Sequence, residues 1–308
     1  MTAITGDTRL AGVAVPVRPR SAAAIAIASL VGLAGFGWPL LADPGSGLAH
    51  AADAPFLFVV LLPLLLAVVL AEVSEGGMDA KAVALLGVLA AVGAALRPLG
   101  AGTAGLEPTF FLLVLAGRAL GAGFGFVLGA VTLFASALLT GGVGPWLPFQ
   151  MLGAAWVGLL AGALPPARGR AELALIAAYG AGAGLAYGVA LNLSIWPFLA
   201  APGTAIAFVA GDPLTDNLGR FVAFSLATSL GFDVPRALLT AALVLVAGRP
   251  VLLALRRAAR RAAFDAPVHF EAPAHVDAPA HVDAPAHFDA PAPRRLATDP
   301  PPAHFGEP

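Results

Sequence analysis

The chain has 308 residues, of which 59% are hydrophobic and only 11% are charged, whereas about 25% of residues are charged in soluble domains. This composition indicates an integral membrane protein, so we expect the lipid bilayer as its surroundings and no nucleic-acid partner. The formal net charge is −1 and cysteine is absent, which excludes disulfides, thiolate metal sites and cysteine nucleophiles.

Two membrane helices are predicted in residues 21–78, after a polar cytoplasmic tail formed by residues 1–20. The first is the uncharged run 21–42, whose 22 residues can span a hydrocarbon layer about 30 Å thick. A cleaved signal peptide is the alternative, although its apolar part is usually only about 7–15 residues long. The second span is expected at 54–71.

A six-helix membrane core is predicted in residues 79–260. Glycine and proline are costly inside helices, and their positions place the expected helices at 82–96, 108–120, from the turn 121–125 to 140, 148–164, 171–197 and 234 to about 255. Residues 221–230 are apolar but too short to cross, so 198–230 is left open as loop, re-entrant or interfacial helix. The predicted fold class is all-α, a polytopic membrane helix bundle of about eight spans.

Asp233 stands where a helix N-cap would lie, and Pro235 would sit just inside the first turn, which is typical helix-opening chemistry. Small residues also recur at every fourth position, which lets helix backbones approach closely in lipid. These small-residue ladders are Gly87/Ala91/Ala95, Gly117/Gly121/Gly125/Gly129, Ala154/Gly158/Gly162 and Gly180/Gly184/Gly188. We expect them to pack inside the protein, with docking of another membrane protein as the alternative.

Arginine and lysine are distributed unevenly between the two sides of the predicted bundle. If the N-terminus is cytoplasmic, twelve lie on the cytoplasmic side: Arg9, Arg18, Arg20, Lys81, Arg118, Arg168, Arg170, Arg249, Arg256, Arg257, Arg260 and Arg261. Only Arg97, Arg220 and Arg236 lie opposite. The positive-inside rule therefore predicts a multi-pass protein of the inner (cytoplasmic) membrane with both termini cytoplasmic.

The tail, residues 261–308, contains a proline-rich hexapeptide repeat with little bulk to bury, so we expect it to be disordered. Its repeated histidines could bind a divalent metal loosely, but a plain cytoplasmic tail is the preferred interpretation and no metal site is predicted. The role of the tail stays open.

No predicted span contains a histidine, which argues against intramembrane hydrolysis that needs a base or zinc ligands at depth. A phosphate-binding GxxxxGK[ST] loop is also absent from the sequence. We therefore expect no enzyme and no cofactor. A proton-driven carrier would need an acidic residue deep in a span, and the predicted spans offer none.

The glycine- and proline-rich turn within residues 138–156 is expected to form the lid or floor of a binding site. The candidate substrate-binding residues are polar and aromatic side chains at the ends of predicted spans on the non-cytoplasmic side, with Trp156 and Tyr187 deeper. They are Arg97, Glu107, Trp146, Gln150, Trp156, Tyr187, Asn192 and Trp196. Small-molecule pockets are mostly apolar with a few placed polar groups, although tryptophan and tyrosine also gather at membrane interfaces without a ligand. Arg97 and Glu107 could instead pair with each other, and Gln150 and Asn192 could join helices. Asn192 is the strongest candidate.

Three segments carry a resemblance to a known family: DAKAVALLGVLAAVGAALRPLG, the glycine-rich stretch around TGGVGPWLPFQ, and SLGFDVPRALLTAALVLVAGRPVL. They resemble the substrate-binding S components of energy-coupling factor (ECF) vitamin transporters of actinobacterial type. The resemblance implies a six-helix core and ATP-driven import of a vitamin or related micronutrient captured from outside. Cobalamin is the first expectation, followed by thiamin-related and other vitamins.

The resemblance also implies partners, namely a transmembrane coupling protein and ATPase subunits. The family's docking ladder on the first core helix corresponds here to Gly87, Ala91 and Ala95. The two N-terminal helices would be additions whose role stays open. The alternative is a non-transporting scaffold or channel-like subunit that assembles with partner proteins, which uptake assays with and without the coupling module would distinguish.

Overall fold

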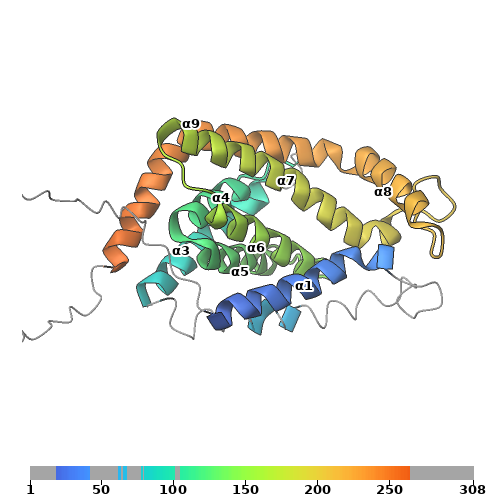
Figure 1. Cartoon of the computed structure of the whole chain (residues 1–308), viewed down its shortest axis with the longest axis horizontal. Helices are drawn as coiled ribbons and strands as arrows, with labels where there is room; N and C mark the ends of the chain where they lie inside the picture. The colour runs from blue at the N-terminus through green and yellow to red at the C-terminus, as the bar shows by residue number, and fades with distance from the viewer. Residues whose placement is uncertain are drawn as a thin grey trace, which may run out of the picture. The chain divides into compact units, whose positions relative to one another are not determined.

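The computed structural model describes residues 19–41, 62–63, 65–67, 78, 80–100 and 105–263 (Figure 1). The first 18 residues, most of the predicted span 54–71 and the repeat tail from residue 264 lie outside these ranges. Predictions made for those segments stay predictions.

Every regular element in the described ranges is helical. The α-helices are α1 (Pro19–Leu41), α3 (Ala80–Leu96), α4 (Thr109–Leu120), α5 (Ala122–Thr140), α6 (Leu147–Ala163), α7 (Gly169–Leu199), α8 (Leu214–Thr228) and α9 (Leu230–Ala263), and a 3₁₀ turn, η3, spans Arg97–Gly100. The all-α class is confirmed. Five helices, namely α1, α3, α5, α7 and α9, are long and apolar enough to cross a membrane, whereas α4 and α6 are shorter. These helices are consistent with a multi-pass membrane protein, but the predicted count of about eight spans is not confirmed.

The break between α4 and α5 is a single residue, Gly121, which has φ +104°. Residues that carry a side chain rarely adopt this backbone conformation, so glycine at this position allows the sharp turn between the two helices. The prediction of two helices here is confirmed, with a turn shorter than the expected 121–125.

Helices α5 and α6 pack backbone against backbone. A Cβ atom added at Gly125 would meet the carbonyl of Gly158, and one added at Gly158 would meet the carbonyl of Gly125. In lipid, where burial of apolar groups does not drive association, such close approach supplies the van der Waals contact that holds helices together. These two ladders pack inside the protein, as the sequence predicted.

Helices α7 and α9 lie side by side and run in opposite directions (Figure 1). The ladder of α7 faces α9: an added Cβ at Gly180 would come within 2.8 Å of the Thr240 side chain, and one at Gly188 would meet the carboxylate of Asp233. This third ladder therefore makes room for polar side chains of α9 as well as for close packing.

Two predictions about the start of the last span need correction. A helix, α8, covers 214–228, and α9 already begins at Leu230 and continues to Ala263, beyond the expected limits of Val234 and Leu255. Asp233 therefore lies in the first turn of α9 and is not an N-cap. Its carboxylate bonds Arg236 one turn along the same helix.

Candidate functional site

A compact charge cluster joins α9 to the loop before α4. The Arg236 guanidinium donates from Nε to Glu107 Oε2 at 2.6 Å and from Nη1 to Asp233 Oδ1 at 2.6 Å. A third, longer contact of 3.4 Å runs from Nη1 to the carbonyl oxygen of Gly184 on α7. Because the side chains of Arg236 and Asp233 are about nine-tenths buried, each charge depends on the other for compensation.

Aromatic rings enclose this guanidinium. Its central carbon lies 5.4 Å from the ring centroid of Phe110 and 5.3 Å from that of Tyr187, within the range of cation–π attraction. The two rings meet edge to face at 4.9 Å. Phe110, Tyr187 and Arg236 come from α4, α7 and α9, so the cluster fixes three helices relative to one another.

Tyr187 also lines an apolar cavity of about 350 Å³ between α6 and α7. The other lining residues are Gly153, Trp156, Val157, Leu160, Tyr179, Gly182, Ala183, Ala186 and Ala190. The Tyr179 hydroxyl donates to the carbonyl of Val157 at 2.7 Å, and the Trp156 indole N–H donates to Ser29 on α1 at 2.9 Å. These polar groups are already bonded, so the cavity presents aromatic and aliphatic surface.

Arg97 and Glu107, which the sequence allowed to pair with each other, have different partners. Arg97 Nη2 donates to Gln150 Oε1 at 2.9 Å, whereas Glu107 bonds Arg236. The first contact joins η3 to the first turn of α6, and the second joins the loop before α4 to α9. Two cross-links between the ends of helices thus result, one between Arg97 and Gln150 and the other between Glu107 and Arg236.

Asn192 is buried and only partly satisfied. Its Oδ1 accepts a hydrogen bond of 2.8 Å from the hydroxyl of Ser229, at the junction of α8 and α9. Its Nδ2 is buried without a partner among the described residues. A buried amide N–H without an acceptor is costly, so this atom is a candidate donor to a bound group.

The three predicted tryptophans have separate environments. Trp196 is fully buried, donates to the carbonyl of Ile206 at 2.7 Å and packs against Phe208, Phe221 and Phe224. Trp146 is 47% exposed and bonds the carbonyl of Gly142 in its own turn. Only Trp156 lines the α6–α7 cavity. The structure therefore brings Trp156 and Tyr187 together and leaves Trp146 and Trp196 apart from them.

The predicted docking ladder lies on the outer face of α3. Gly87, Ala91 and Ala95 are all exposed, and open space surrounds the position of a Cβ at Gly87. Neighbouring Val88 and Val92 are 61% and 45% exposed. Unlike the ladders of α5, α6 and α7, this one does not face a close helix partner within the described ranges.

Sequence reasoning missed the central member of the charge cluster. Arg236 was counted only as a charge on the sparsely basic side, and Asp233 only as a helix cap. The signal that could have found them is their spacing: opposite charges three residues apart share one helix face. At the start of an apolar helix such a pair indicates mutual burial.

An apolar cavity with a charge cluster against one of its wall residues is an arrangement suited to binding a small organic molecule. Within the described ranges, no group of three or more histidine, aspartate or glutamate side chains is arranged to hold a metal ion. Comparison of the chain with models of protein families, with curated proteins and with solved structures finds no match.

Proposed function

We propose that this chain is the substrate-capture membrane subunit of an ATP-driven ECF-type importer, which binds a vitamin or related micronutrient from outside. The observation that carries the proposal is the position of Tyr187, which lines the α6–α7 cavity and also contacts the Arg236 guanidinium. A ligand in the cavity would meet aromatic surface beside a fixed set of charges, which is the usual composition of a small-molecule pocket.

The orientation of the site is part of the same proposal. Arg97, Glu107 and Arg236 belong to the end of the bundle that carries few basic residues, whereas Arg118, Glu172 and Arg256 form a network at the opposite ends of their helices. By the positive-inside rule, the first group faces outward and the second faces the cytoplasm. Capture then takes place on the outer side of the inner membrane.

The size of the cavity bears on the cargo. At about 350 Å³ it lies near the lower end of the range for small-molecule sites, about 300–1,000 Å³. Cobalamin, a corrin macrocycle with a nucleotide loop, would extend beyond this volume through the open side of the cavity. A small vitamin with an aromatic ring suits the walls formed by Trp156, Tyr179 and Tyr187, so a thiamin-related compound is the preferred cargo.

Energy supply is assigned to partner subunits. In this proposal the exposed face of Gly87, Ala91 and Ala95 docks on the transmembrane coupling protein, because small side chains allow the close helix approach that association in lipid requires. ATPase subunits bound to that partner drive release of the cargo inward.

The test is mass spectrometry of small molecules that copurify with the protein, followed by uptake assays in cells with and without the coupling module. A vitamin that copurifies and is taken up only with the module supports the proposal. No bound vitamin and no module-dependent uptake would favour a scaffold or channel-like subunit and overturn it.

A further inference from the structure

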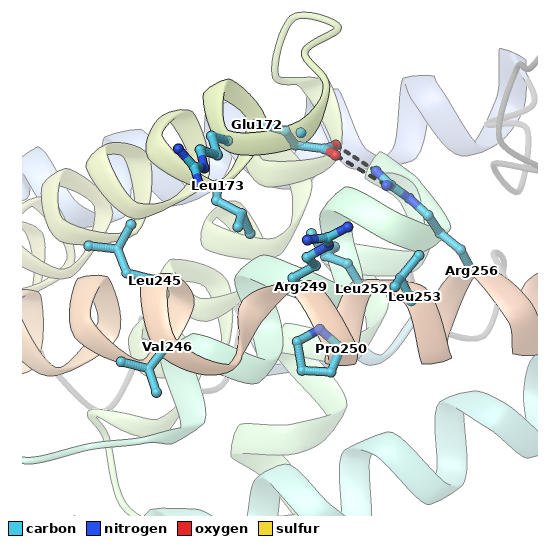
Figure 2. A pocket seen from close by; sticks show the side chains of 11 residues that line it. Glu172, Leu173, Leu245, Val246, Arg249, Pro250, Leu252, Leu253 and Arg256 are labelled. Atoms are coloured by element: carbon cyan, nitrogen blue, oxygen red, sulfur yellow. Dashed lines mark hydrogen bonds and ion pairs between the residues drawn. The ribbon is translucent and has the colours of Figure 1, made fainter.

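A second cavity, of about 810 Å³, lies between the first turn of α7 and the C-terminal part of α9 (Figure 2). Its lining residues are Gly169, Arg170, Glu172, Leu173, Leu245, Val246, Arg249, Pro250, Leu252, Leu253 and Arg256, none of which lines the α6–α7 cavity. Pro250 lies inside α9, where it lacks an N–H and bends the helix. Figure 1 shows the direction of α9 changing toward its C-terminal end.

The only acidic residue of this lining already has its charge compensated. Glu172 accepts hydrogen bonds from Arg256 Nη2 at 2.5 Å and from Arg118 Nε at 2.9 Å, and its side chain is only 7% exposed. Figure 2 shows the paired contacts between Glu172 and Arg256 across the cavity. Glu172 is therefore not available to neutralise the remaining arginines.

Two arginines of the lining, Arg170 and Arg249, are exposed and form no hydrogen bond or ion pair with the part of the chain that the structure describes. The Arg249 side chain extends from α9 toward α7, into the space between the helices (Figure 2). With three arginines against one compensated glutamate, the cavity carries a surplus of positive charge. An anionic group is its complementary occupant.

The wall beside these arginines is apolar and faces outward. Val246 is 84% exposed, Leu245 58% and Leu253 49%, on a helix long and apolar enough to cross a membrane. In a bilayer such side chains contact acyl chains. An occupant that satisfies both parts of the cavity carries an anionic group joined to hydrocarbon chains, and a soluble phosphate would leave the apolar wall uncovered.

We propose that this cavity is a binding site for an anionic phospholipid, with the headgroup phosphate between Arg170 and Arg249 and the acyl chains along Leu245, Val246 and Leu253. Basic pockets between membrane helices suit such headgroups because each arginine adds attraction to the lipid's negative charge. The site is independent of the substrate proposed above, since the two cavities share no residue.

The experiment is native mass spectrometry of the full chain in detergent, titrated with phosphatidylglycerol or with phosphatidylcholine. We expect the unmodified protein to prefer phosphatidylglycerol. The double variant Arg170→Gln/Arg249→Gln should bind phosphatidylglycerol about 25-fold more weakly, at about fivefold for each arginine removed, with phosphatidylcholine binding unchanged. Neither arginine has a partner to lose among the residues that the structure describes, so the variant should keep the melting temperature of the unmodified protein without added lipid.

The matched control is Arg257→Gln/Arg260→Gln, which removes the same charge from exposed positions of α9 outside the lining. This control should keep the preference for phosphatidylglycerol over phosphatidylcholine. The variant Arg170→Lys/Arg249→Lys, which retains the charge, should keep it as well. If the control lost as much affinity for phosphatidylglycerol as Arg170→Gln/Arg249→Gln, the preference would come from diffuse charge and the proposal would be overturned. Equal affinity for both lipids, or displacement of phosphatidylglycerol by millimolar glycerol 3-phosphate, would also overturn it.

Discussion

Arg236 and Glu107 lie 129 residues apart in the chain and form an ion pair of 2.6 Å that joins the start of α9 to the loop before α4. The same guanidinium holds Asp233 at 2.6 Å and lies over the ring of Tyr187. A single side chain thus links the charge cluster to the wall of the α6–α7 cavity.

Replacement of Arg236 by methionine is expected to destabilise the protein strongly. It would leave the Glu107 and Asp233 carboxylates without their cation, and removal of one partner from a buried ion pair costs about 3–5 kcal/mol. The control is Arg220→Met, since Arg220 pairs with Asp212 near the surface and exposed pairs contribute about 0–1 kcal/mol. Thermal unfolding in detergent compares the two variants, and equal losses would contradict a central role for Arg236.

Added bulk at Gly158 is expected to disrupt the packing of α6 against α5. The Cβ of Gly158→Leu would meet the backbone of Gly125, which cannot move aside as a flexible side chain would, so a cost at or above the usual 1–3 kcal/mol for overpacking is expected. Gly87→Leu, on the open face of α3, is the control. Size-exclusion profiles and melting temperatures should show a loss for Gly158→Leu alone.

Sequence patterns predicted the helices well because long apolar runs and glycine–proline turns are local signals. The break at Gly121 and the long α7 follow from such patterns. The start of α9 was placed four residues too late, because Asp233, a residue type common at N-caps, lies within the first turn of the helix instead and bonds Arg236 there. The pairing of Glu107 with Arg236 could not be predicted, since it depends on how helices distant in the sequence pack together.

Candidate site residues were predicted less completely than helices. Aromatic residues near helix ends look alike in sequence, yet Trp196 packs against phenylalanines while Trp156 lines a cavity. Which face of a helix a side chain occupies follows from the 3.6-residue period, but whether that face meets a cavity or a neighbour depends on tertiary packing.

Neither Asn192 nor Gln150 lines the α6–α7 cavity, so Asn192→Ala and Gln150→Ala test whether the ligand extends beyond that cavity. If it does, each variant is expected to weaken binding of the copurifying ligand while leaving expression intact. Asn192 Nδ2 has no partner among the described residues, and Gln150 holds Arg97. Loss of one hydrogen bond, direct or through positioning, corresponds to a roughly two- to tenfold weaker affinity. Isothermal titration calorimetry measures it, and unchanged dissociation constants for both variants would remove these residues from the site.

Ala91→Leu is expected to block uptake and spare ligand binding. The side chain would project from the exposed face of α3, where bulk prevents the close approach that helix association in lipid requires. Gly219→Leu, at an open position of α8, is the control and should transport normally. Uptake at the level of the control would contradict docking through this face, and loss of both uptake and binding would indicate misfolding.

Gly182→Leu is expected to abolish ligand binding by filling the α6–α7 cavity. Gly182 lines that cavity, and no atom lies within 4 Å of a Cβ built at this position, so the first atom of the new side chain meets no neighbour. Leucine is also a better helix former than glycine, by roughly 0.5–1 kcal/mol, and the melting temperature should therefore stay equal or rise.

Gly219→Leu again serves as the control, because it adds the same side chain at an open helical position outside the cavity lining. Binding of the copurifying ligand, measured by titration calorimetry, should be lost in Gly182→Leu alone. Retained affinity in a well-folded Gly182→Leu protein would show that the ligand binds elsewhere.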